Sequence, residues 1–208
     1  GESIFTGNTV EMRIPHDHQH VLGIYHQAGE KEIKLAIESA MDAWQDWSTL
    51  PWESRVALFK RMASILQRTH EQTINASTML GQSKNAFQAE IDASCEFIDF
   101  LNFNASFAQE IYEQQPPYSP DGIWNMVENR PLEGFVFAVT PFNFTSIAGN
   151  LPTAPALMGN VALWKPASSS VYSGYFLMKL FEEAGLPKGV INFIPGSGRE
   201  VGPRVLES

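Results

Sequence analysis

The sequence is poor in cysteine, in basic residues and in long apolar runs. One Cys in 208 residues excludes an internal disulfide and fits a reducing compartment. Fourteen Lys and Arg against 23 Asp and Glu give a formal net charge of −9, which argues against a nucleic-acid partner. No apolar run approaches the roughly 20 residues of a membrane-spanning helix, and the first residues do not resemble a secretory leader. We therefore expect no nucleic-acid or membrane partner, and a location in the cytosol or, if a transit peptide has been removed, in the mitochondrial matrix.

The remaining composition describes a globular protein with a sizeable core, since 44% of the residues are hydrophobic and only 18% are charged. Apolar residues recur at three- and four-residue steps through much of the first half, which predicts helices. Two short strands, at 10–14 and 21–25, should precede three helices, the last ending at Gly81. A long helix is predicted over 86–112, with an inward face that includes Phe87 and Ile91.

The stretch 112–133 predicts a protruding element or a boundary. Two prolines end the long helix at Pro116-Pro117, and Ser119-Pro120-Asp121-Gly122 makes a turn. A strand-like run, Ile123–Val127, follows the turn.

The pattern changes at Gly134. The nearly all-apolar run 134–139 is typical of a strand buried on both faces. A helix is predicted over 145–158, a second strand over 161–164, another helix that ends at Gly185, a third strand over 190–194 and the start of a third helix at 196–202. This β-α-β-α-β order predicts an α/β fold with a parallel sheet.

Three features stand at successive strand-to-helix junctions, where open α/β sheets bind ligands. Asn143 follows the first strand, and its carboxamide suits a developing oxyanion, or else simply a turn or helix cap. Lys165 ends the second strand and could meet ribose or phosphate oxygens, or else lie on the surface with its charge in water. Gly196-x-Gly198-x-x-x-Gly202 follows the third strand, with a spacing one residue longer than the usual dinucleotide fingerprint.

Two other features are weaker candidates. Cys95 lies within the long predicted helix with no His near it in sequence, so a buried structural thiol is expected rather than a nucleophile. His16, His18 and His20 alternate and could form a metal pair, but an exposed turn around Asp17 and Gln19 is favoured.

Together the three junction motifs resemble the aldehyde dehydrogenase superfamily, in which the same features occur in this order. Asn143 and Lys165 are 22 residues apart, and Lys165 and Gly196 are 31 apart, as in that family. Residues 88–92, 97–100, 140–145, 149–151 and 154–160 are more specifically similar to its 1-pyrroline-5-carboxylate dehydrogenase branch. The resemblance covers essentially the whole chain.

The resemblance implies an NAD-dependent oxidation of glutamate γ-semialdehyde to glutamate, in proline catabolism and without a metal. Asn143 would be the oxyanion-stabilising residue and Lys165 would bind the adenosine ribose. The other implied cofactor-groove residues are Thr140, Pro141, Phe142, Pro166, Ser168, Gly198 and Gly202. Ser168 departs from the Glu of many relatives, so this position does not distinguish NAD from NADP.

The resemblance also implies an arrangement of the chain. Residues 1–111 would form the N-terminal hairpin and helices of the cofactor-binding domain, and 134–208 the first part of its Rossmann-like sheet. Residues 112–133 would be a hairpin that joins subunits into a homo-oligomer. The family's nucleophilic Cys and general-base Glu have no counterpart here, so we expect a truncated and inactive portion of an enzyme.

Two alternatives remain open. One is a reductive relative that acts on an acyl phosphate, and the other is a non-catalytic module for nucleotide binding or assembly. The edge and apolar face of a partial sheet also predict self-association or marginal stability.

Overall fold

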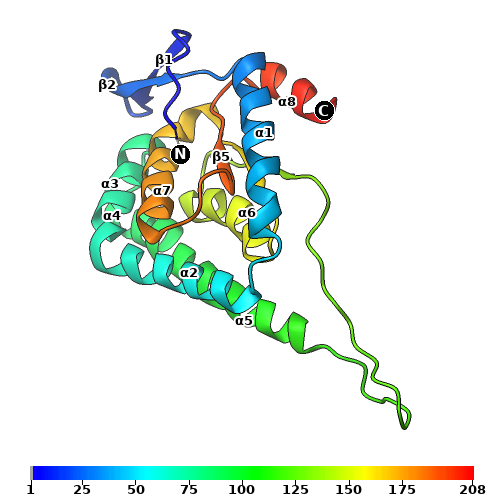
Figure 1. The fold of residues 1–208 in the computed structure, drawn as a ribbon. Helices are drawn as coiled ribbons and strands as arrows, with labels where there is room; N and C mark the ends of the chain where they lie inside the picture. The colour runs from blue at the N-terminus through cyan, green and yellow to red at the C-terminus, as the bar shows by residue number, and fades with distance from the viewer. Residues whose placement is uncertain (1) are drawn as a thin grey trace.

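The computed structural model describes residues 2–208, and its elements follow the predicted order closely (Figure 1). They are β1 Thr9–Ile14, β2 Asp17–His26, α1 Glu30–Trp47, α2 Trp52–Ile65, η1 Leu66–His70, α3 Glu71–Gln82, α4 Ala86–Ala89, η2 Glu90–Cys95, α5 Glu96–Glu113, β3 Val136–Val139, α6 Thr145–Leu157, β4 Ala162–Lys165, η3 Ser168–Ser170, α7 Val171–Ala184, β5 Ile191–Phe193 and α8 Gly198–Leu206. The segments η1 and η2 are π-helical, whereas η3 is a 3₁₀ turn.

The second half of the chain builds a sheet that is parallel, as predicted, and its strand order is β3-β4-β5. All four residues of β4 are buried because it lies in the middle. The prediction that 134–139 is buried on both faces was wrong, since Ala138 alone is buried in β3 and Val139 is 55% exposed. The reason is that β3 is an edge strand of the described sheet and lacks a neighbour on one side.

The helices of the first half share one hydrophobic core with this sheet. Phe59 and Phe97 are buried in the same cluster as Trp164 and Phe181, so the stretches 1–111 and 134–208 pack as one body. None of the helices within residues 2–208 has the length and apolar character to cross a membrane.

The long helix predicted over 86–112 exists, but η2 interrupts its α-helical hydrogen bonding. A π-turn contains an extra residue, so the side chains before and after it fall out of the 3.6-residue phase. The inward positions predicted for Phe87 and Ile91 were wrong, as these residues are 72% and 47% exposed. Phe97 and Leu101, beyond the π-turn, are buried as expected.

Residues 114–133, here called the arm, leave the end of α5 and project away from the body (Figure 1). The strand predicted at Ile123–Val127 does not form. Side-chain bonds replace a ladder: the Gln115 amide donates to the Val127 carbonyl (3.1 Å) and accepts from its N–H (2.9 Å). Several apolar side chains of the arm lie in solvent, with Trp124 82% exposed.

A buried arginine fixes the root of the arm. Arg55, 3% exposed, donates to the Tyr112 hydroxyl and to the Leu157 carbonyl at the end of α6, each at 2.9 Å, and also to the Leu50 carbonyl. Burial lowers the pKa of its guanidinium. The hydrogen-bond partners of the guanidinium are neutral groups. The C-terminal end of α6, which lies at Leu157, carries a partial negative charge that stabilises the cation. On the return side of the arm, the Trp44 indole donates to the Leu132 carbonyl (3.1 Å).

Candidate functional site

Parallel pairing brings the ends of β3 and β4 to one edge of the sheet. Val139 pairs with Lys165, and the Thr140 N–H donates to the Lys165 carbonyl (3.2 Å). The Thr140 hydroxyl accepts from the Trp164 indole at 2.9 Å, and Thr140 is only 4% exposed. This hydroxyl therefore ties the edge together from inside.

Lys165 is not the surface lysine that the sequence left open, because it is only 8% exposed. Its ammonium donates to the Pro166 carbonyl (2.8 Å), and burial lowers its pKa. A Cβ atom added to Gly198 would lie 3.7 Å from the Lys165 Cε, so the lysine stem runs beside the glycine turn. The structure thus brings together two candidates that are 33 residues apart in sequence.

The three glycines of the turn differ in what they permit. A Cβ on Gly196 would lie 2.8 Å from the Val201 side chain, so this glycine is required for packing. Gly198 has room only for ordinary contact, whereas a Cβ on Gly202 would meet nothing within 4 Å. The first amides of α8, which begins at Gly198, have no intrahelical acceptor and make this end of the helix suitable for an anion.

Asn143 lies exposed in the short turn between β3 and α6. The N-cap of α6 is Phe144, and that position makes no side-chain cap bond, which argues against the helix-cap alternative for Asn143. Within residues 2–208 the Asn143 side chain forms no hydrogen bond, so its amide is free to donate to a ligand. Phe142 beside it is 63% exposed, and Pro141 is partly buried.

The start of α6 is gripped by the helices of the first half. The Thr145 hydroxyl is hydrogen-bonded to Thr78 and to the Gln82 amide, both at 2.8 Å. Ser146 donates to the Glu96 carboxylate, which places a negative charge at the favourable N-terminal end of α6. The sequence reasoning missed these residues; their only signal was a polar side chain on an otherwise inward helix face.

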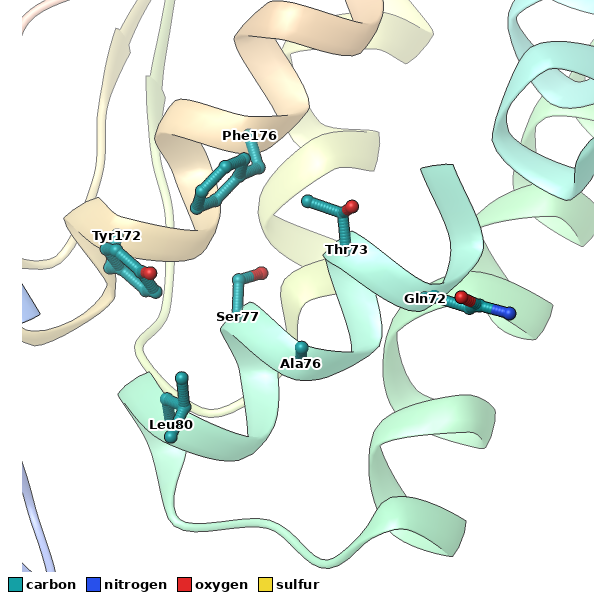
Figure 2. A pocket seen from close by; sticks show the side chains of 7 residues that line it. All are labelled: Gln72, Thr73, Ala76, Ser77, Leu80, Tyr172 and Phe176. Atoms are coloured by element: carbon teal, nitrogen blue, oxygen red, sulfur yellow. The ribbon is translucent and has the colours of Figure 1, made fainter. Parts of the chain in front are cut away.

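The remaining groove candidate, Ser168, lies three residues beyond Lys165. Ser168 is exposed in η3, just beyond the buried Pro166. Figure 2 shows a hollow between α3 and α7, lined by Thr73, Ser77 and Phe176 among others, and none of the predicted site residues lines it.

Cys95 is exposed, so the prediction of a buried thiol was wrong. It is the last residue of the π-turn, which carries it outward. Partial burial, and then the nearby Glu90, Glu71 and Asp99 carboxylates, raise the pKa of the thiol. A thiol that resists ionisation makes a poor nucleophile.

The turn expected around Asp17 and Gln19 was also misplaced, because β2 begins at Asp17. The turn is at Pro15–His16, and the His16 imidazole is hydrogen-bonded to the Ser83 hydroxyl (2.7 Å). Across the described chain, no three His, Cys, Asp or Glu side chains gather as a metal ion would need.

Known proteins resemble the chain along its whole length. The model of the aldehyde dehydrogenase family matches residues 5–208. The mitochondrial delta-1-pyrroline-5-carboxylate dehydrogenase of Dictyostelium discoideum is 51% identical over 208 residues, which are all of this chain and 37% of the relative. The human mitochondrial enzyme of that name is 41% identical over 207 residues, again 37% of its length.

Solved structures agree. The delta-pyrroline-5-carboxylate dehydrogenase of Mycobacterium tuberculosis superimposes with a TM-score of 0.97 at 49% identity, over all of this chain and 39% of that one. A structure of that enzyme bound with NAD gives 0.92 at 50% identity, over 98% of this chain and 37% of that one. The chain spans less than two fifths of the length of these relatives. Its sequence and its fold together place it in the aldehyde dehydrogenase family.

Proposed function

We propose that these residues provide the oxyanion-binding loop and part of the cofactor groove of an NAD-dependent dehydrogenase that oxidises glutamate γ-semialdehyde to glutamate. One observation carries the proposal: Asn143 presents an unpaired amide at the same edge of the sheet as Lys165 and the Gly198 turn. The relatives named above support the choice of substrate and cofactor.

The groove residues fit the adenosine half of a dinucleotide. The Lys165 ammonium, the Pro166 carbonyl and the exposed Ser168 hydroxyl suit ribose hydroxyls, and the small Gly198 admits a close approach. NAD, when bound, would accept the hydride lost by the aldehyde. The neutral Ser168 neither attracts a 2′-phosphate nor repels it, so the preference for NAD rests on the relatives.

The chemical role of Asn143 follows from its exposure and its lack of internal partners. When a nucleophile adds to the aldehyde carbon, the carbonyl oxygen gains negative charge that the carboxamide N–H can stabilise. Cys95, the one cysteine here, has a raised pKa, so the thiolate and the general base would be supplied by residues beyond these 208. We therefore propose that the 208 residues alone have no dehydrogenase activity.

Glu96 gives the loop a charge that suits this substrate. Its carboxylate binds Ser146, which is three residues beyond Asn143. Glutamate γ-semialdehyde carries both an ammonium and a carboxylate group, and a carboxylate at this position would attract its ammonium end. Replacing Glu96 by Gln should therefore raise KM for the aldehyde more than it lowers kcat.

The arm supports a second proposal, that the chain assembles with further copies of itself. It exposes Trp124 and other apolar side chains while its root is held by Arg55. Apolar side chains on a projecting segment suit burial against a partner. We therefore keep residues 112–133 as the proposed homo-oligomer contact and 134–208 as the proposed partial cofactor sheet that follows it. The relatives of Dictyostelium discoideum and human are mitochondrial enzymes, which favours a mitochondrial location over the cytosol.

The test is NADH formation from pyrroline-5-carboxylate by the complete reading frame that contains these residues, beside the 208-residue chain. We expect turnover by the complete frame alone, and a fall in its kcat of about 100- to 1,000-fold in Asn143→Ala. Asn102→Ala, at an exposed Asn on α5, is the matched control and should leave kcat unchanged.

Absence of turnover in a folded, NAD-binding protein would reject the substrate assignment. Strict dependence on phosphate and NADPH would instead favour the reductive acyl-phosphate relative. A folded oligomer without nucleotide affinity would favour the assembly module.

A further inference from the structure

Asn143 makes no internal hydrogen bond within the described chain, so its place depends on the residues that follow it. Thr145 and Ser146 are fixed by hydrogen bonds from α3 and α5, as described above. Phe144, the residue next to Asn143 in the chain, is held by a cation–π contact instead of a hydrogen bond. The Lys84 ammonium lies 4.2 Å from the centre of its ring.

Lys84 is well placed to hold this ring. Its side chain is only 14% exposed, and its ammonium lies 2.5 Å from the carboxylate of Asp92, which is itself 24% exposed. A cation attracts the face of an aromatic ring more strongly where water is partly excluded. The ion pair with Asp92 in η2 also restricts where the ammonium can go. Lys84 therefore links the π-turn to the loop that carries Asn143.

The backbone on either side of Lys84 is also held. Ser83 has φ 55° and ψ 36°, and no other non-glycine residue in 2–208 has a positive φ. Such a conformation costs on the order of 1 kcal/mol and persists only where surrounding contacts impose it. The His16 imidazole meets the Ser83 hydroxyl at 2.7 Å, and Asn85 caps α4. These contacts fix the direction in which Lys84 leaves the chain.

We propose that Lys84, anchored by Asp92, is a positioning residue that holds Phe144 and thereby orients the Asn143 amide. The catalytic meaning of that orientation rests on the proposed function, whereas the positioning itself is a property of these 208 residues. Lys84 acts through Phe144 and does not touch the substrate.

Hydrogen exchange of the Ala148 amide tests the positioning, because this N–H donates to the Phe144 carbonyl at 3.0 Å. In the 208-residue chain, Lys84→Met should speed exchange at Ala148 about tenfold, since the ring loses a partly desolvated cation. Asp92→Asn should speed exchange at Ala148 less than Lys84→Met does. Lys84→Arg should exchange at Ala148 as slowly as the unsubstituted chain. The melting temperature should change little in each variant.

The matched control is Lys179→Met. Lys179 also pairs with a carboxylate, Glu182 at 2.9 Å, and lies 5.4 Å from the centre of the Tyr175 ring. It is far more exposed, and its loss should leave Ala148 exchange unchanged. Unchanged exchange at Ala148 in Lys84→Met would overturn the proposal. So would faster exchange throughout the chain, or failure of Lys84→Arg to restore it.

A double-mutant cycle in the complete reading frame separates positioning from general support. Lys84→Met should lower kcat about tenfold with little change in KM for NAD, and should have no further effect on kcat in an Asn143→Ala background. Equal effects in both backgrounds would overturn the link to Asn143. If the complete frame has no turnover, the proposed function fails while the exchange experiment still decides the role of Lys84.

Discussion

The loop at Asn143 and the arm at residues 114–133 both reach solvent, but the structure holds them in opposite ways. The loop presents one polar group, and side chains from α3, from Lys84 in the loop after α3 and from α5 fix the residues beyond it. The arm presents apolar groups and is fixed at its root, while the side-chain bonds that Gln115 makes along its length are exposed. A rigid polar group suits a small reacting molecule, whereas a projecting apolar segment suits another protein surface.

The largest effect on folding should come from the root of the arm. Arg55→Met would leave the Tyr112 hydroxyl and the Leu157 carbonyl without their partner in a buried setting. We expect the free energy of unfolding to fall by about 3 kcal/mol, measured by chemical denaturation. Arg61→Met, at an exposed position of the same helix, should change it by less than about 0.5 kcal/mol. Equal losses in both variants would mean that the root is not a special contact.

Trp124→Ala should separate assembly from folding. Because Trp124 is 82% exposed, its loss should leave the free energy of unfolding of the dissociated chain nearly unchanged. Its removal should weaken self-association by about 2 kcal/mol, or roughly thirtyfold in Kd, measured by analytical ultracentrifugation. Phe5→Ala removes another exposed aromatic ring, outside the arm, and should not affect association. A Kd that is the same in both variants would contradict the role given to the arm.

Lys165→Met should weaken binding and strengthen the fold together. Burial lowers the folded-state pKa of Lys165. At neutral pH the folded chain therefore carries a charge that is poorly solvated, whereas in the unfolded chain the same charge is in water, so the charge destabilises the folded state. We expect the variant to gain about 1 kcal/mol of unfolding free energy at pH 7. The gain should shrink as the pH rises through the folded pKa towards the ordinary lysine value of 10.5.

Calorimetry checks the other half of this prediction, since NAD affinity should fall about tenfold in the same variant. Lys179→Met is the control, because the pKa of Lys179 is raised rather than lowered in the folded chain. Loss of this lysine should not increase the free energy of unfolding. A variant that loses stability at pH 7 would contradict the sign of the argument.

The smallest effect concerns Cys95. Its raised pKa should slow alkylation at pH 7.5 several-fold relative to a free cysteine, with the rate rising at more alkaline pH. The rate of iodoacetamide labelling, followed by mass spectrometry, measures this. A rate equal to that of free cysteine would mean that the neighbouring carboxylates and partial burial do not act on the thiol.

Local patterns were enough to predict the sheet. Each of its strands lies in a short, mostly apolar run, and Gly185 ends α7 in the left-handed conformation that its residue type favours. The meeting of Lys165 with the Gly198 turn also follows from the sequence, because parallel strands end at one edge. Neither Lys84 nor Glu96 could be found in this way. Their partners, Phe144 and Ser146, are 60 and 50 residues away. Lys84 lies in the loop before α4, where no helical period applies, and the π-turn η2 breaks the period just before Glu96.

Arg55 was hidden for another reason. Arginine in an amphipathic helix is most often exposed, and only the packed ends of α5 and α6 make this one buried. The strand predicted in the arm failed because a strand-like run of residues alone does not make a strand. A strand also needs a neighbouring backbone, and Gln115 supplies side-chain bonds in its place.

The π-turn η2 also determines how this region tolerates changes in length. A π-turn is equivalent to one residue inserted in an α-helix, so deletion of one of residues 93–95, which lie between Asp92 and Glu96, could restore regular α-helical bonding. Each residue turns an α-helix by roughly 100°, so the deletion would rotate Asp92 relative to Glu96 by about that angle. The contacts of Asp92 with Lys84 and of Glu96 with Ser146 could not then both persist. Substitutions in 93–95 should therefore be tolerated more readily than a deletion there.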